Sequence, residues 1–301
     1  MVVALFSLAI AIASFFHHPV ANNSTIVSHE SALQRIKREG VIRVGYGGFS
    51  PYTIIDPKET DPNKRIKGFA ADIVNEIASR SVPKLKVEWH LINWDTLRPD
   101  MLSKKFDFIA DPNYQTVPRA LEFDYTDPYS YFGIALGIVR KNEQRFKTFQ
   151  DLDRSDITLV GAEGWVSTDY AKAHLTKAKM RTIPVGGDAF TQLDDVLMGR
   201  ADAAVQDSPT AVQYAKAHPD KIKVLWVDHP PTIVPGGFSV RHEDPDLVQF
   251  LNTCLRILKT DGTISNLDKK WKTYGYMEEQ KIVPAIGLRE YLSSDQHKHE
   301  L

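Results

Sequence analysis

Apolar residues in the first part of the chain follow two alternating patterns. Three short segments have patterns typical of strands: residues 41–45, 85–91 and 106–110. Three segments have helical spacing: a capping-box pattern from Ser31 that Gly40 closes, apolar positions 69, 73, 74 and 77 after Gly68, and Trp94, Leu97, Met101 and Leu102 along one face. This alternation predicts a parallel sheet covered by helices.

The same alternation restarts further along the chain. The predicted strands are residues 157–161, 181–185, 201–205 and 222–227, and the predicted helices are 167–175, 189–199 and 209–217. A second unit of this kind implies a second lobe.

Two apolar segments, residues 132–141 and 233–241, run between these units. Two helices follow the second segment, at 247–258 and from Thr263 to Trp271. If both segments cross between the lobes, the second lobe is an insertion within the first. We therefore expect a two-strand hinge and a cleft. Clefts at the carboxyl ends of parallel strands are where such sheets bind small molecules.

Composition narrows the classes of function. The 301 residues are 43% hydrophobic and 25% charged, with a net charge of −1 and no long charged run, which argues against nucleic acid as a partner. The single cysteine, Cys254, excludes a disulfide within the chain. No histidines and carboxylates stand at metal-ligand spacing, so we predict no metal site.

The N-terminal run from residue 2 to residue 16 carries no charge. Its length is that of a signal-peptide core and is short for a membrane span, so we predict an export signal over residues 1–21. No basic residue precedes the run, and Pro19 stands at the −3 position of a cleavage site near Ala21. A membrane tether is therefore the alternative.

A polar motif follows the strand predicted at 106–110. Thr116-Val117-Pro118-Arg119 places a hydroxyl and a guanidinium on one turn. Arginine binds a carboxylate through two parallel charge-assisted hydrogen bonds, and the threonine hydroxyl can reach the same oxygens. The alternative is a helix N-cap threonine with a surface arginine.

Further short motifs follow one another along most of the chain. They are Ile42–Gly45, Phe49–Tyr52, Gly68–Ile73, Trp94–Leu97, Phe106–Ile109, Thr116–Arg119, Phe123–Tyr129, Gly199–Val205 and Leu258–Thr263. In order and spacing this set resembles the family 3 extracellular solute-binding proteins, the amino-acid-binding components of bacterial ABC importers. The resemblance runs from about residue 31 to 276 and implies a two-lobed, periplasmic-binding-protein-like α/β fold of type II, with parallel-rich sheets flanked by helices.

The resemblance also implies boundaries and a ligand site. Lobe 1 is expected at 31–135 and 236–276, lobe 2 at 136–235, and a polar C-terminal tail at 277–301. Arg119 would clamp the α-carboxylate of an amino acid with help from Thr116. Ser167 and Thr168, at the start of a second-lobe helix, would offer backbone N–H groups to the anion. Asp207 would pair with the α-ammonium; its alternative role is the N-cap of the helix at 209–217.

Aromatic residues are candidates for the walls of the site. Phe49, Tyr52 and Trp94 can bury apolar carbons or stack on a cation, and their alternative is core packing. Tyr52, after Pro51 at a strand end, is the strongest of the three. Where the family carries a small, glycine-containing run, this chain has Asp111-Pro112-Asn113-Tyr114-Gln115. Asp111 can favour a ligand with an extra donor, or can be a buried turn carboxylate that bonds to its own backbone.

These features predict ligand binding without chemistry and without a cofactor. A monomer in the periplasm or outside the cell would close around an amino acid or related carboxylate and present it to the membrane permease of an ABC importer. A sensor that presents its closed form to a receptor is equally compatible. An enzyme resembling the cyclohexadienyl (arogenate/prephenate) dehydratases is the other alternative. However, the stretch from Pro231 to Phe238 lacks the general acid that this chemistry needs.

Overall fold

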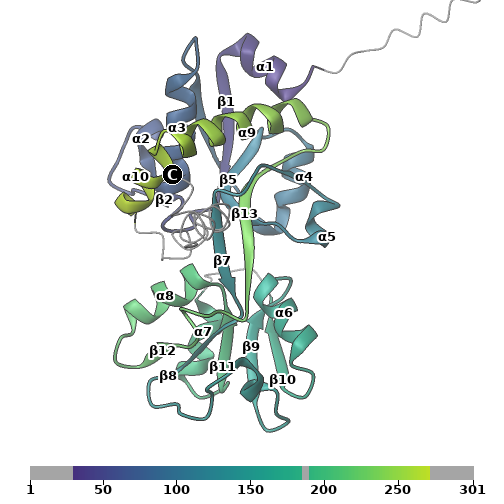
Figure 1. Ribbon diagram of the computed structural model, residues 1–301, viewed down its shortest axis with the longest axis vertical. Helices are drawn as coiled ribbons and strands as arrows, with labels where there is room; N and C mark the ends of the chain where they lie inside the picture. Colours follow the sequence, from purple (N-terminus) through teal and green to yellow (C-terminus); the bar gives the residue numbers. More distant parts are fainter. Residues whose placement is uncertain (1–29, 185–189, 272–301) are drawn as a thin grey trace, which may run out of the picture. The chain divides into compact units, whose positions relative to one another are not determined.

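The computed structural model describes residues 30–184 and 190–271 (Figure 1). The described residues from Ser31 onward belong to a single unit of the chain. The predicted export signal and the predicted C-terminal tail lie outside the described residues. Within the described ranges, no helix is both long enough and apolar enough to cross a membrane.

The first sheet has the order β4-β1-β5-β13-β6, and β7 pairs with β13. Its strands are β1 (Val41–Tyr46), β4 (Lys86–Leu91), β5 (Phe108–Tyr114), β6 (Asp124–Tyr125), β7 (Ser130–Ile134) and β13 (Thr232–Val240). The neighbours β4, β1 and β5 are parallel, whereas β13 is antiparallel to β5, β6 and β7.

The second sheet has the order β10-β9-β11-β8-β12. Its strands are β8 (Leu136–Arg140), β9 (Thr158–Ala162), β10 (Lys179–Ile183), β11 (Ala203–Gln206) and β12 (Ile222–Val224). Here β10, β9 and β11 are parallel, and β8 is antiparallel to both of its neighbours. Both sheets therefore place three parallel strands first and one antiparallel strand fourth.

Helices flank both sheets. Those preceding the second sheet are α1 (Ala32–Glu39), α2 (Pro62–Arg65), α3 (Phe69–Arg80), α4 (Leu97–Leu102) and α5 (Val117–Ala120), with the 3₁₀ turn η1 (Trp94–Thr96). A second 3₁₀ turn, η2 (Phe149–Leu152), lies between β8 and β9. Helices α6 (Val166–His174), α7 (Thr191–Leu197) and α8 (Ser208–Ala217) contact the second sheet. After β13 come α9 (Pro245–Thr260) and α10 (Thr263–Trp271). A small hairpin joins β2 (Ile54–Ile55) to β3 (Ile66–Lys67).

Two segments connect the sheets, as the sequence predicts. One is β7 followed by β8, which a break at Ala135 separates because that residue has a φ of 62°. The other leads from β12 into β13. Two serines, at the start of α6 and of α8, form hydrogen bonds with the backbone at this break. Ser167 Oγ accepts the Ala135 N–H at 3.2 Å, and Ser208 Oγ accepts the Gly133 N–H at 3.2 Å. We call residues 133–135 the junction.

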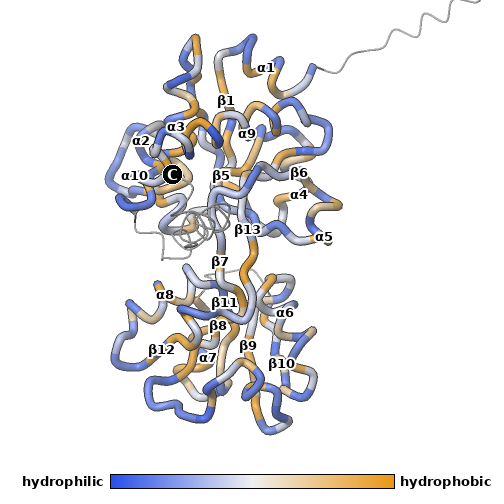
Figure 2. The backbone as a smooth tube through the Cα atoms, viewed as in Figure 1, coloured by the Kyte–Doolittle hydropathy of each residue, from blue (hydrophilic) through white to orange (hydrophobic). Residues whose placement is uncertain are grey.

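Burial follows the apolar pattern of the sequence. The central strands are buried almost throughout, and Figure 2 shows hydrophobic colour along strands such as β9 and hydrophilic colour on the outer loops. An aromatic group fills the core of the first sheet, with Phe108 against Phe238 at 5.0 Å and Tyr129 against Phe238 at 4.7 Å between ring centroids. Buried apolar area of this kind is the main source of folding free energy.

The α/β fold class, with two parallel-rich sheets and two connecting segments, is confirmed. Local predictions differ at several places. The strand predicted at 222–227 ends as β12 at Val224. The strand predicted at 106–110 continues as β5 to Tyr114, so residues 111–114 of the departure lie within a largely buried strand. The sequence predicts that the apolar residues from Trp94 to Leu102 share one helix face. This prediction is wrong for the first and the last of them, since Trp94 is 42% and Leu102 51% exposed. The segment begins as a 3₁₀ turn, which has three residues per turn and shifts Trp94 off that face.

Candidate ligand-binding site

The predicted anion motif forms a helix cap at the carboxyl end of β5. Thr116 is the N-cap of α5, and its Oγ1 accepts the backbone N–H of Arg119 at 3.4 Å. The N-cap alternative for Thr116 is therefore realised. Capping by Thr116 does not prevent Arg119 from binding an anion, because the cap uses the backbone N–H of Arg119 and not its guanidinium.

The Arg119 guanidinium is half-buried and has only neutral partners. Its Nη1 donates to Asn113 Oδ1 at 3.0 Å. No carboxylate in the part of the chain that the structure describes forms an ion pair with it. Tyr125 stands close by: burial raises the pKa of Tyr125 to about 12 despite the opposing arginine charge. A half-buried guanidinium without an acidic partner can bind a carboxylate through two hydrogen bonds.

Asp207 occupies the corresponding end of β11. It is 4% exposed and is the N-cap of α8, with Oδ1 accepting the Thr210 N–H at 2.9 Å. The N-cap alternative is therefore realised here as well. Among the described residues, no lysine, arginine or histidine forms an ion pair with this carboxylate. Burial raises the pKa of the Asp207 carboxyl above its ordinary value, and the hydrogen bonds from Thr210 oppose that shift.

A side-chain contact joins the regions that follow β1 and β11, since Gln213 Nε2 of α8 donates to the Ser50 carbonyl at 2.6 Å. Tyr114, the last residue of β5, lies near Asp207: burial and the Asp207 charge together raise the pKa of the Tyr114 hydroxyl well above its ordinary value. Its ring lies 4.8 Å from that of Phe132. The sequence marked Tyr114 only as part of an unusual run, because nothing local indicates that Asp207, 93 positions away, lies near it.

Ser167 and Thr168 begin α6, but their hydroxyls face inward. The Ser167 hydroxyl holds the junction, as described above. Thr168 is fully buried, and its Oγ1 lies against β9, where a Cβ on Gly161 would come within 2.3 Å of it. The side chain of Thr168 is therefore not available to a ligand, and what α6 can offer at this end is backbone N–H groups.

Asp111 supports a loop. It is fully buried in β5, where its carboxylate accepts the Gly47 N–H and the Thr53 hydroxyl. Thr53 Oγ1 in turn accepts the N–H of Gly48 at 3.1 Å and of Phe49 at 3.2 Å. Burial raises the pKa of Asp111 to about 7. This geometry favours the structural alternative, although the bonds go to the loop after β1 and not to the backbone of Asp111 itself.

The three predicted aromatic walls differ in their surroundings. Tyr52, the strongest of them from sequence, is 2% exposed, and its hydroxyl bonds to Ser130 Oγ at 2.8 Å. Phe49 is half-buried and stacks on Tyr52, with ring centroids 5.5 Å apart. Trp94 covers Gly47, where a Cβ would lie 2.8 Å from the indole Nε1. Tyr52 thus packs as core, and Phe49 and Trp94 keep the exposure that a ligand wall needs.

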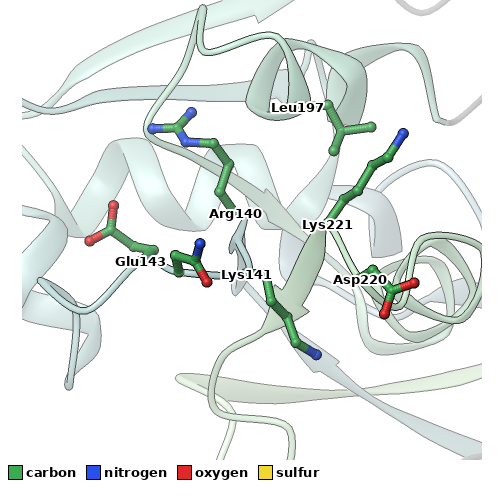
Figure 3. A pocket seen from close by; sticks show the side chains of 7 residues that line it. Arg140, Lys141, Glu143, Leu197, Asp220 and Lys221 are labelled. Atoms are coloured by element: carbon green, nitrogen blue, oxygen red, sulfur yellow. The ribbon is translucent and has the colours of Figure 1, made fainter.

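A separate pocket of about 460 Å³ opens beside the end of β8 (Figure 3). Its lining is largely charged: Arg140, Lys141, Asn142, Glu143, Leu197, Asp220 and Lys221. Arg140 is already used there, since its Nη1 donates to the carbonyls of Val196 at 2.9 Å and Ala201 at 3.1 Å. No residue predicted for the ligand site lines this pocket. In the described ranges, no cluster of histidine, cysteine and acidic residues could hold a metal ion.

The two sheets share one arrangement, three parallel strands followed by an antiparallel one, and charged side chains lie at the ends of β5 and β11. This arrangement is that of a protein that binds a small solute. Residues 42–274 match the model of the bacterial extracellular solute-binding proteins, family 3. The match covers most of the chain, and the protein belongs to this family.

Relatives and solved structures agree with that assignment. A probable amino-acid ABC transporter-binding protein of Haemophilus influenzae is 26% identical over 252 residues, which are 83% of this chain and 91% of that protein. The crystal structure of an ancestral amino-acid-binding protein, a precursor of cyclohexadienyl dehydratase, has a TM-score of 0.67 and 33% identity and covers 80% of this chain and 99% of its own. A putative ABC transporter binding component from Wolinella succinogenes, complexed with lysine, has a TM-score of 0.67 and 29% identity, with 77% of this chain and 95% of its own covered.

One enzyme also appears among the relatives. The cyclohexadienyl dehydratase of Pseudomonas aeruginosa is 24% identical over 257 residues, which are 84% of this chain and 90% of that protein. The relatives of this chain therefore include both binding proteins and a dehydratase, and the choice between these functions depends on the residues of the site.

Proposed function

We propose that this protein binds an amino acid or a closely related small carboxylate and delivers it to the membrane permease of an ABC importer. The observation that carries the proposal is a pair of buried or half-buried charges without ionic partners among the described residues. Arg119 at the end of β5 would take the carboxylate, and Asp207 at the end of β11 would take the ammonium. An α-amino acid carries both charges on neighbouring groups, so it can satisfy both residues at once.

Closure around the ligand follows from where these residues lie. Arg119 lies just after β5 of the first sheet and Asp207 just after β11 of the second, so an approach of the two sheets would bring both residues to one ligand. We take residues 31–135 and 236–276 as one lobe and 136–235 as the other, joined at the junction and β13. A ligand with higher affinity for the closed form shifts the population toward it, and the permease would recognise that form.

Two further residues complete the proposed site. Phe49 and Trp94 would border the side chain of the ligand, while the N–H groups at the start of α6 would support its carboxylate. Asp111 would act indirectly, by holding the loop that carries Phe49.

We propose that the mature protein is a monomer that is exported and lacks residues 1 to about 21. Mass spectrometry of the protein from the extracellular or periplasmic fraction tests this. A chain with its N-terminus intact in the membrane fraction would support a membrane tether instead.

We further propose that the protein is not an enzyme. The stretch from Pro231 to Phe238 includes no acid or base, and Asp111, whose pKa burial raises to about 7, is fully buried. Without a proton donor at the leaving group, a dehydratase would lose about 10²–10⁴ in rate. The Pseudomonas relative is the reason to test the alternative, by assaying release of carbon dioxide from arogenate and prephenate.

A thermal-shift screen tests the proposed function directly. The twenty amino acids, small carboxylates, arogenate and prephenate would each be added to the purified mature protein, and titration calorimetry would measure the affinity of those that act. A ligand at one hundred times its Kd raises stability by about 2.7 kcal/mol. A stabilising amino acid whose effect disappears in Arg119→Ala supports the proposal. Stabilisation by none of these compounds would reject the ligand class.

A further inference from the structure

One side of the Arg119 guanidinium is anchored and the other is open. Nη1 donates to Asn113 Oδ1 at 3.0 Å. Neither Nε nor Nη2 has a hydrogen-bond partner in the part of the chain that the structure describes. Nε and Nη2 lie on one edge of the planar guanidinium, and a carboxylate can accept both N–H groups of such an edge at once. The bond to Asn113 therefore leaves a complete two-donor edge for a ligand.

Asn113 is itself held in place. It is 4% exposed, and its Nδ2 donates to Ser239 Oγ of β13 at 3.4 Å. An amide carries its donor and its acceptor on different atoms, so the contact of Nδ2 with Ser239 directs Oδ1 toward Arg119. Side-chain bonds thus connect β13, through β5, to the guanidinium.

The backbone of β5 is irregular just before Asn113. In the pairing with β13, Ile109 lies opposite Ser239 and Asn113 lies opposite Gly237, so four residue steps on β5 match two on β13. The interval contains Pro112, which has no backbone N–H to contribute to the ladder. Bulges of this kind change the direction in which a side chain points. This one precedes the residue that binds Arg119.

The residue pair after Asn113 fixes the other end of this segment. The Gln115 backbone N–H donates to the Pro235 carbonyl at 2.9 Å, and Gln115 Nε2 donates to the Thr126 carbonyl at 2.9 Å. Asn113 is therefore anchored to β13 before and after the turn into α5. The unusual run at 111–115 has a structural result, which is a fixed amide beside Arg119.

We propose that Asn113 is the positioning residue of the anion site, which holds the Arg119 guanidinium with its Nε and Nη2 edge free for the carboxylate of the ligand. This inference rests on the proposed function, since it concerns how Arg119 takes the carboxylate. Asn113 does not touch the ligand and acts through Arg119.

The neutrality of the amide is as important as its position. An aspartate at position 113 would have nearly the same shape, but its charge would pair with Arg119 and repel the carboxylate of a ligand. An amide oxygen accepts one N–H and leaves the positive charge uncompensated. Asn113 therefore orients Arg119 without neutralising it, and this selects an anionic group at the first-sheet end of the ligand.

The Asn113–Arg119 contact can be tested without a ligand. Asn113→Asp places an acid beside Arg119, so its penalty on the folding equilibrium constant should be at least about tenfold larger when Arg119→Ala removes the cation. Asn252→Asp is the matched control, since Asn252 is a buried asparagine of the same sheet's helix α9 and accepts the Asp127 N–H at 2.6 Å. Its penalty should be equal in both backgrounds. Urea unfolding of the purified variants measures these penalties.

Each result of this cycle has a definite meaning. A double variant that does not fold, while Asn252→Asp with Arg119→Ala does, is the extreme case of the expected coupling. Equal penalties of Asn113→Asp in the two backgrounds would overturn the inference.

Binding of L-lysine tests the positioning role. In titration calorimetry, Asn113→Ala should bind L-lysine about three- to tenfold more weakly than wild type, because it removes one orienting bond. Asn113→Asp should bind at least about thirtyfold more weakly, although it preserves shape better than alanine does. Asn252→Asp should change the affinity by less than about twofold. A merely structural role predicts the reverse order, with the alanine variant the weaker, and that order would contradict the inference.

The two proposals fail in different ways. If wild type binds neither L-lysine nor any other amino acid of the thermal-shift screen, the proposed ligand class is wrong, and coupling in the urea cycle would still show that Asn113 holds Arg119. If amino acids bind and Asn113→Asp responds as Asn252→Asp does, the proposed function stands and Asn113 is not a positioning residue.

Discussion

Strands β5 and β11 hold the same position in their sheets, third in the order and next to the antiparallel strand, but they end in opposite charges. Each is followed by a capped helix, α5 with Thr116 and α8 with Asp207 as N-cap. At β5 the cap is neutral and a cation stands three residues later. At β11 the cap is itself the anion. One architecture thus provides a cation on one sheet and an anion on the other, a pairing that suits a zwitterion.

The two ends also differ in how their charges are satisfied. Arg119 is half-buried with an amide as its partner, so solvent still reaches it. Asp207 is buried, and its carboxylate accepts the backbone N–H of Thr210. Because a buried charge is more costly to leave without partners, the anionic end is built with internal donors and the cationic end is left open. We therefore expect the carboxylate of the ligand to contribute more to affinity than its amine.

The largest effect is expected from the cationic end. Arg119→Ala should weaken amino-acid binding by about 2–5 kcal/mol, since it removes one side of a desolvated charge pair. Calorimetry with the tightest amino acid from the screen measures this. Arg98→Ala, an exposed arginine on α4, is the matched control and should bind as wild type does. Unchanged affinity in Arg119→Ala would exclude the cationic end from the site.

A smaller effect is expected from the anionic end. Asp207→Asn keeps the cap and the shape but removes the charge, so it should weaken an amino acid by about 1.5–3 kcal/mol and its deaminated analogue much less. Asp169→Asn, an exposed acid in the first turn of α6, controls for the change in net charge. Equal losses for the two ligands would show that Asp207 serves only as the cap of α8.

Stability should depend on pH through the buried carboxylate of β5. Burial raises the pKa of Asp111 to about 7, so between the ordinary value and pH 7 the native state holds one more proton than the unfolded chain. The free energy of unfolding therefore falls as pH rises through that window, by about 4 kcal/mol in total, and Asp111→Asn should remove this part of the decline. Urea unfolding between pH 4 and pH 8 measures the slope, with the exposed Asp228→Asn as control. If the dependence of stability on pH is unchanged in Asp111→Asn, other groups are responsible for it.

The smallest effect is expected at the junction. Ser167→Ala and Ser208→Ala each leave a buried N–H of the connecting strand without its acceptor, so each should lower the free energy of unfolding by about 1 kcal/mol. Ser79→Ala removes an exposed hydroxyl and should cost less. If Ser167→Ala weakens ligand binding by as much free energy as it removes from folding stability, the Ser167 side chain of α6 contacts the ligand. A third charge-binding element, α6, would then have to be added to the comparison of β5 and β11.

Local chemistry explains which parts of the fold the sequence predicted well. The capping box at Ser31 and the left-handed Gly40 both appear as predicted, because each depends only on residues within one turn. The N-cap alternatives at Thr116 and Asp207 were available for the same reason. The alternation of apolar segments gave both sheets, since burial on both faces requires continuous apolar strands.

Contacts between distant residues explain what the sequence did not predict. Gln213 meets Ser50, and Asp111 meets Gly47, only because the folded chain brings them together. From the sequence, an aromatic residue after Pro51 fits either a ligand wall or the core. The hydrogen bond between the Tyr52 hydroxyl and Ser130 shows that Tyr52 packs in the core. Such choices depend on tertiary packing, which residue type and spacing do not specify.

The position of β13 has a consequence for how the protein is made. This strand completes the first sheet between β5 and β6, but it is synthesised only after every strand of the second sheet. Until it arrives, the nascent chain carries β5 and β6 with unpaired edges, which are open to wrong partners. Closure of the first sheet then requires contacts between residues far apart in sequence, a feature typical of slow folding. The second sheet, made from a continuous stretch, has all of its strands long before the first does.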